Sequence, residues 1–199
     1  RLIMVRHGET IWNREKRVQG FSDVDLSEEG LIQTEKLAIA LREKRIEAIC
    51  TSPLRRAFHT ARTIGKFHHL PLMIEPQLKE LIQGDLEGKT YLELRDDYGS
   101  LLAQWLENPA SFIMPNGESL AQLQERAWPV IERLIRADKD TLVVSHSFTI
   151  MVLLCRIRGL DLSRVREVQV GLASRTEVEI NNGRWEVEIF NDTSHLQCE

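Results

Sequence analysis

The chain has 199 residues, of which 42% are hydrophobic and 28% charged, and 30 acidic against 26 basic residues give it a formal net charge of −4. This composition is typical of a globular protein and excludes a disordered or fibrous chain. The length predicts a single domain over residues 1–199. Because an acidic chain without a Lys/Arg-rich block is a poor nucleic-acid binder, we expect no nucleic-acid partner.

Membrane, disulfide and metal signals are also missing. No stretch approaches the roughly 20 apolar residues of a membrane span, and the chain opens without a signal-peptide pattern, so the sequence predicts a cytoplasmic protein with no membrane partner. Cys50, Cys155 and Cys198 are scattered and form no C-x-x-C pair, which argues against a disulfide framework or a zinc site. The adjacent His68 and His69 have no third ligand nearby, so we predict no metal site.

Short apolar runs alternate with helical spacings along the first 75 residues. Ser27 followed by two glutamates is a helix N-cap signal, and Ser52 followed by Pro53 predicts a second helix start. The pattern predicts strands at 2–5, 48–51 and 72–74 and helices at 28–43 and 52–67.

The pattern loosens over 84–117, where glycine and proline are frequent and one or two short helices fit between 90 and 107. We predict that 84–117 is a short helical lid inserted over the strand ends, where open α/β sheets bind ligands. Beyond it the sequence predicts a helix that Pro129 should kink or split, a buried strand, another helix and a hairpin, at 120–134, 141–144, 148–158 and 176–189. The predicted fold class is α/β in three layers, with a mostly parallel central sheet, helices on both faces and a C-terminal hairpin.

Reactive side chains follow four of the predicted strands. Arg6 and His7 follow the first, Arg56 follows the second, Glu80 follows the third, and His146 follows the strand at 141–144. If these strands are parallel neighbours, the five side chains converge at one end of the sheet. Guanidinium groups grip phosphate oxygens and an imidazole can attack phosphorus, so such a set suits phosphoryl transfer. Taken alone, each side chain would have a structural or surface role.

The same residues belong to motifs that resemble the histidine phosphatase superfamily, in the branch that contains the cofactor-dependent phosphoglycerate mutases. The motifs stand in family order over nearly the whole chain: RHGET-x-WN at 6–13, QG at 19–20, DLS-x-x-G at 25–30, S-x-L-x-RA-x-x-TA at 52–61, L-x-E-x-x-x-G-x-x-EG at 78–88, GESL at 117–120 with Arg126, and VVSH at 143–146.

This resemblance implies a role for each matching residue. His7 would be the nucleophile and become a phosphohistidine, while Arg6, Arg56 and His146 bind the phosphate and Glu80 serves as acid and then base. Further phosphate or substrate contacts would come from Asn13, Gln19, Gly20 and Ser147. Guanidinium and imidazole groups would supply the positive charge, so the resemblance implies no metal and no cofactor. Ser147 stands where the family usually has glycine.

Within the superfamily, the sequence favours a phosphatase acting on a small phosphorylated metabolite over a mutase. The mutases carry an Arg pair after the tryptophan that Trp105 resembles, and this chain does not. Seven acids between positions 84 and 119 stand against two basic residues, Lys89 and Arg95. We expect this acidic, partly apolar lid to take a neutral, aromatic or amine-bearing leaving group. Phosphoserine, α-ribazole phosphate and a broad range of monoesters all stay open as substrates.

Other classes of protein fit less well. The segment 84–90 looks like a nucleotide-binding P-loop, but it has three residues between its glycines where that loop has four, and it carries two acids. The alternatives that remain are a cofactor-dependent phosphoglycerate mutase and a catalytically idle binding protein on the same fold. His195 has no assigned role. The terminal hairpin offers an edge strand that leaves a homodimer open.

Overall fold

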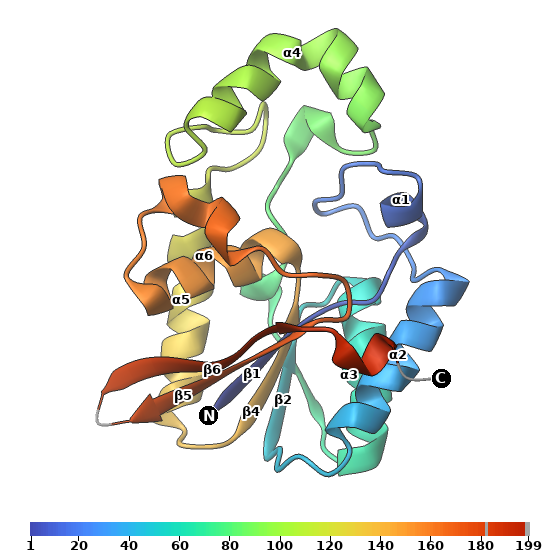
Figure 1. Cartoon of the computed structure of the whole chain (residues 1–199), viewed down its shortest axis with the longest axis vertical. Coiled ribbons are helices and arrows are strands. Elements are labelled where there is room, and N and C mark those ends of the chain that lie inside the picture. The colour runs from blue at the N-terminus through green and yellow to red at the C-terminus, as the bar shows by residue number, and fades with distance from the viewer. Residues whose placement is uncertain (182, 198–199) are drawn as a thin grey trace.

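A six-stranded sheet lies between two layers of helices in the computed structural model, which describes residues 1–181 and 183–197 (Figure 1). The strand order is β3-β2-β4-β1-β5-β6, in which β1 to β4 are parallel and β5 joins β1 antiparallel. The strands are β1 Leu2–Arg6, β2 Ala48–Thr51, β3 Leu72–Ile74, β4 Thr141–Ser145, β5 Arg175–Asn181 and β6 Arg184–Asp192.

The helices cover both faces of this sheet. They are α1 Ile11–Arg14, α2 Glu28–Leu41, α3 Arg55–His68, α4 Tyr91–Glu107, α5 Leu120–Arg136 and α6 Ser147–Arg158. Short 3₁₀ turns occupy Pro76–Leu78, Gly84–Leu86, Leu162–Val168 and Ser194–Leu196. No helix in the described ranges is long and apolar enough to cross a membrane.

Side chains along each strand point alternately to the two faces of the sheet, and both faces are apolar, which explains why there are two helical layers. Ile3 and Val5 of β1 belong to one hydrophobic cluster with residues of α2 and α3. Leu2 and Met4 point to the other face and pack in a second cluster with residues of α5 and α6. A strand buried on both faces is typical of a parallel sheet covered by helices. The predicted three-layer α/β class is confirmed.

The predicted start of α3 is wrong, and of the kink or split expected at Pro129 the split does not occur. Ser27 caps α2 by accepting from the backbone N of Gly30, but the similar signal at Ser52 does not cap α3, which begins at Arg55 with Leu54 as its N-cap. The hydroxyl of Ser52 instead lies beside His146, a buried residue that follows β4. Pro129 does not split α5, which runs unbroken from residue 120 to 136.

The helical part of the lid lies where it was predicted, whereas the hairpin is longer than predicted. The lid contains one helix, α4, whose backbone leaves helical geometry at Tyr98, and it stands over the end of the sheet together with α1 (Figure 1). The hairpin extends to Asp192. Asn182 of its predicted turn and Cys198 lie outside the described residues. Cys50 and Cys155 are buried and form no disulfide.

Candidate active site

The strands β1 and β4 bring the two histidine motifs together. They pair in parallel with Arg6 opposite Ser145, so His7 and His146 leave the sheet at the same edge. The centroids of the two imidazole rings are 5.2 Å apart. On the other side of β4, β2 leads into Ser52, whose Oγ lies 2.8 Å from Nε2 of His146.

His7 is a buried, neutral imidazole with one ring nitrogen available. Its Nδ1 lies 2.7 Å from the carbonyl oxygen of Gly8, and because a carbonyl only accepts hydrogen bonds, Nδ1 carries the proton. Burial lowers the pKa of His7 well below its ordinary value, and the guanidiniums of Arg56 and Arg6 lower it further. Nε2 is therefore unprotonated and nucleophilic at neutral pH.

Two guanidinium groups lie beside this imidazole, and backbone carbonyls hold both. Arg56, in the first turn of α3, is fully buried and donates to the carbonyls of Ser22 and Gly20, each at 2.8 Å. Arg6 donates from Nη1 to the carbonyl of Val170 at 2.8 Å. In both arginines Nε is buried and has no hydrogen-bond partner in the described part of the chain. Burial lowers the pKa of Arg56 to about 10, so its charge persists at neutral pH.

His146 and Ser147 form the N-terminal end of α6. His146 is the N-cap residue and is fully buried, and its Nδ1 has no partner among the described residues. Burial and then the charge of Arg56 lower the pKa of His146 well below its ordinary value. Ser147 lines the cavity described below. The peptide dipoles at this helix end favour negative charge in front of it.

Glu80 places its carboxyl group against the same helix end. Oε1 accepts from the backbone N of Leu81 at 2.9 Å and of Thr149 at 3.2 Å, and Oε2 accepts from the backbone N of Phe148 at 3.2 Å. Burial raises the pKa of Glu80, although these backbone donors and the two arginines oppose the shift. Because Oε2 has fewer donors than Oε1, it is the oxygen better able to hold a proton.

Arg126 was not predicted as a site residue, yet it fixes the segment that carries Glu80. From α5 it donates to the carbonyls of Gln77, Lys79 and Glu80 at 2.7, 2.9 and 2.7 Å. It also pairs with Glu118 through two bonds of 3.1 and 2.6 Å. The sequence offered one signal for Arg126, its position after the GESL motif, but that position does not show which residues Arg126 contacts.

The predicted contacts Asn13, Gln19 and Gly20 divide into two kinds. The side-chain oxygens of Asn13 and Gln19 each lie 2.9 Å from the hydroxyl of Thr10, and both side chains line the cavity. Gly20 does not line it. Its carbonyl oxygen accepts from Arg56, and a Cβ at this position would overlap neighbouring atoms. Gly20 therefore holds the Arg56 guanidinium in place and does not line the cavity itself.

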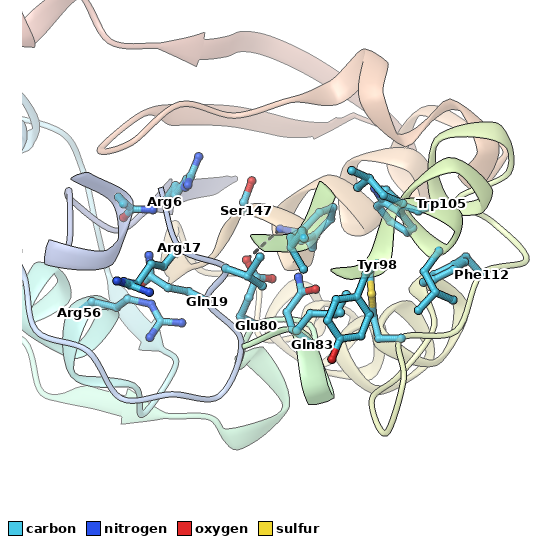
Figure 2. Close-up of a pocket in the computed structure, with 18 of the residues that line it drawn as sticks. Arg6, Arg17, Gln19, Arg56, Glu80, Gln83, Tyr98, Trp105, Phe112 and Ser147 are labelled. Atoms are coloured by element: carbon cyan, nitrogen blue, oxygen red, sulfur yellow. Dashed lines mark hydrogen bonds between the residues drawn. The ribbon is translucent and has the colours of Figure 1, made fainter. Parts of the chain in front are cut away.

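A cavity of about 280 Å³ joins these groups to the lid. Figure 2 shows Arg6, Arg17, Gln19 and Arg56 at one end and Tyr98, Trp105 and Phe112 at the other, with Glu80 and Gln83 between them. The apolar side chains that line it are Val18, Leu86, Leu94, Leu101, Leu102, Trp105, Phe112, Met114 and Phe148. Arg17, Gln83 and Tyr98 were not predicted, because no local motif marks them.

The acids of the lid lie outside this cavity. All seven between positions 84 and 119 belong to the described part of the chain, and none of them lines the cavity. Glu87 instead accepts from Phe21 and Ser22, and Glu93 caps the first turn of α4. Glu118 pairs with Arg126, as described above. The structure therefore gives no support to the expectation that the acidic lid attracts an amine-bearing leaving group. The expectation of a neutral or aromatic leaving group agrees with the apolar side chains that line the cavity.

The chain belongs to the histidine phosphatase superfamily (branch 1), whose family model it matches over residues 2–193. It is 31% identical to phosphoserine phosphatase 1 of Hydrogenobacter thermophilus, covering 98% of this chain and 94% of that protein. A Yersinia pestis protein named "Probable phosphoglycerate mutase GpmB" is 30% identical, with coverages of 98% and 94%.

A solved structure is similar over the same extent. A mycobacterial glucosyl-3-phosphoglycerate phosphatase in complex with VO3 superimposes with a TM-score of 0.88 at 28% identity, covering 96% of this chain and 98% of that one. The predicted family and the assignment as a histidine phosphatase are confirmed.

Proposed function

We propose that this protein hydrolyses phosphate monoesters with an apolar, preferably aromatic, leaving group through a phosphohistidine at His7. One observation carries the proposal: a single cavity has a cationic end around a neutral His7 and an apolar end made by the lid. The first end suits a phosphate group, and the second suits a group that water solvates poorly.

The first step forms the phosphohistidine. Nε2 of His7 attacks phosphorus while the bond from phosphorus to the leaving oxygen breaks, and Oε2 of Glu80 gives its proton to that oxygen. The unpaired Nε–H groups of Arg6 and Arg56 bind the phosphoryl oxygens, whose negative charge is redistributed in the transition state. His146 donates to the same oxygens from Nδ1 when the Ser52 hydroxyl donates to its Nε2.

The second step returns the enzyme to its starting state. Glu80, now ionised, takes a proton from a water molecule whose oxygen attacks phosphorus. The bond from phosphorus to Nε2 of His7 breaks, which leaves inorganic phosphate, a neutral imidazole and a protonated Glu80. The carboxyl group is suited to both steps because its raised pKa lies nearer to the working pH than that of an exposed glutamate.

Hydrolysis is favoured over phosphoglycerate isomerisation by the position of the charges. A phosphoglycerate carries a second anionic group, which needs a cation besides Arg6 and Arg56. Arg17 also lines the cavity, but it already pairs with Glu15 and donates to the carbonyl oxygen of Gly88. The basic residues of the lid, Lys89 and Arg95, do not line the cavity. Lys89 lies over the ring of Tyr98, and Arg95 pairs with Asp96. The apolar lining supports an uncharged leaving group instead.

The reaction is tested by hydrolysis of p-nitrophenyl phosphate in EDTA, with 3-phosphoglycerate isomerisation measured alongside. We expect EDTA-resistant turnover in the wild type and none in His7→Ala. Glu80→Gln should lose roughly 10²-fold or more on an alkyl phosphate, because the alkoxide then leaves unprotonated. Turnover that survives His7→Ala would overturn the proposed mechanism, and isomerisation faster than hydrolysis would favour the mutase.

The leaving-group preference is tested with two neighbouring residues. Phe112 is buried and lines the cavity, whereas Ile113 is exposed and does not line it. Phe112→Ala should lower kcat/KM for 1-naphthyl phosphate by about tenfold relative to ethyl phosphate, which is in the range expected for a lost pocket contact. Ile113→Ala should leave the ratio unchanged. Equal losses for both esters in Phe112→Ala would refute the apolar subsite.

The cytoplasmic location and the homodimer stay predictions. The partner that the proposed reaction requires is a small phosphate monoester.

A further inference from the structure

The loop 170–174 supports both reactive residues of the first motif. Val170 accepts from the side chain of Arg6 at 2.8 Å, and Ser174 accepts from the backbone N of Arg6 at 3.2 Å. The backbone N of Ala173 donates to the carbonyl oxygen of His7 at 3.0 Å. The position of Arg6 and His7 therefore depends on the conformation of this loop.

That conformation is one that the loop does not favour by itself. Ala173 has φ of 50°, in the left-handed region that residues with a Cβ rarely adopt. Such a residue persists only where surrounding contacts hold it. Ala173 is fully buried, and the contact that reaches its carbonyl oxygen comes from the C-terminal segment.

His195 supplies this contact. Its Nε2 lies 3.0 Å from the carbonyl oxygen of Ala173, and because that oxygen only accepts, Nε2 carries the proton. The side chain is buried, and burial lowers the pKa of His195. Nearby, Oδ1 of Asn191 accepts from the backbone N of Gly171 at 2.6 Å. The C-terminal segment thus holds the loop at two points.

We infer that His195 is a positioning residue for the phosphatase site: its Nε2–H fixes the carbonyl group of Ala173, and the backbone N–H of the same residue orients the carbonyl group of the nucleophile His7. His195 does not line the cavity and touches no reacting atom. Its effect passes through one residue, because Ala173 accepts from His195 with its carbonyl oxygen and donates to His7 with its backbone N. This inference rests on the proposed function, since it concerns the rate at which His7 is phosphorylated.

A matched pair of substitutions separates the hydrogen bond from packing. His195→Gln keeps an N–H donor at a similar reach, whereas His195→Met has nearly the same shape as glutamine and no donor. His68→Met is the control, because His68 is a partly buried histidine at the end of α3 that does not line the cavity. The measurement is single-turnover release of p-nitrophenol with saturating enzyme in excess, together with the melting temperature.

We expect His195→Met to lower the single-turnover rate constant by about tenfold, as a small displacement of a reacting group does. His195→Gln should recover most of the rate, and His68→Met should leave it unchanged. Because the substrate is limiting, the rate constant reports the orientation of His7 in the folded enzyme, whereas a purely structural role would lower the melting temperature and leave this rate constant unchanged.

Two results would overturn the inference while leaving the proposed function intact. One is a wild-type rate constant in His195→Met, whatever its melting temperature. The other is an equal loss of rate in the glutamine and methionine variants, which would show that the donor does not matter. If the wild type itself released no p-nitrophenol, the proposed function would fail and this inference would fail with it.

Discussion

Arg126→Met removes the guanidinium that ties α5 to the segment carrying Glu80. Methionine has a helix propensity close to that of arginine, so the change acts through the lost contacts. These contacts are three bonds to backbone carbonyls and a two-bond pair with Glu118. The variant leaves the Glu118 carboxylate, which is only 7% exposed, without its cation.

The expected loss of stability follows from that burial. Breaking a buried ion pair by removing one partner costs roughly 3–5 kcal/mol. The side chain of Arg126 is 18% exposed, so water reaches the gap and we expect the lower end, about 3 kcal/mol. For a chain of this length, each kcal/mol shifts Tm by roughly 2–4 °C, so Tm should fall by about 6–12 °C.

Urea unfolding and thermal melting measure this loss, and Arg133→Met is the matched control. Arg133 lies on the same helix and pairs with Glu75, but its side chain is 65% exposed, so its loss should cost less than about 1 kcal/mol. Arg126→Met should also lower kcat more for ethyl phosphate than for p-nitrophenyl phosphate, because the alkyl ester depends more on Glu80. Destabilisation by Arg126→Met no greater than by Arg133→Met would refute the reasoning.

Three further results are expected. The pKa of His7 is lowered and that of Glu80 is raised. We therefore expect kcat for an alkyl phosphate to stay level through mildly acidic pH and to fall about tenfold per pH unit above the pKa of Glu80. If Glu80→Gln shows the same fall at high pH, Glu80 is not the acid. Arg56→Lys should raise KM for the monoester at least tenfold, since an ammonium cannot make the same forked contacts, and unchanged steady-state kinetics would count against it. Gly117→Ala should lower the free energy of unfolding by about 1–3 kcal/mol, because its Cβ would stand 2.2 Å from the carbonyl oxygen of Ile82. Gly99→Ala is the control for the same urea titration, and it should not destabilise the protein because the space around Gly99 is open.

The parts of the site that follow a strand directly were predictable from the sequence. His7 comes one residue after β1, and His146 comes one residue after β4. When two strands are parallel neighbours and end at the same edge of the sheet, the residue that follows each strand lies at that edge. The positions of the two imidazoles therefore follow from where β1 and β4 end. The same holds for Arg56, which lies in the first turn of the helix after β2.

What the sequence did not predict depends on contacts between distant segments. Ser27 and Ser52 carry similar helix-start signals, but only Ser27 caps its helix, whereas the Ser52 hydroxyl contacts His146, which is 94 positions away in the sequence. The helix α1 has four residues, too few for a hydrophobic period to appear.

The lid shows why the reaction is easier to predict than the substrate. Its acid-rich composition is a property of the sequence, but whether those acids face the cavity is a property of packing. Most of the lid residues that reach the cavity are apolar, and their acidic neighbours cap α4, hold the loop at Phe21 and Ser22, or pair with Arg126. The cationic end of the cavity consists of charged groups that backbone hydrogen bonds hold in place, so few substitutions preserve it. An apolar surface is defined only by its shape, and many side chains give similar shapes. Substrate preference in this fold should therefore change through substitutions in α4 and the loop after it, while the chemistry at His7 stays the same.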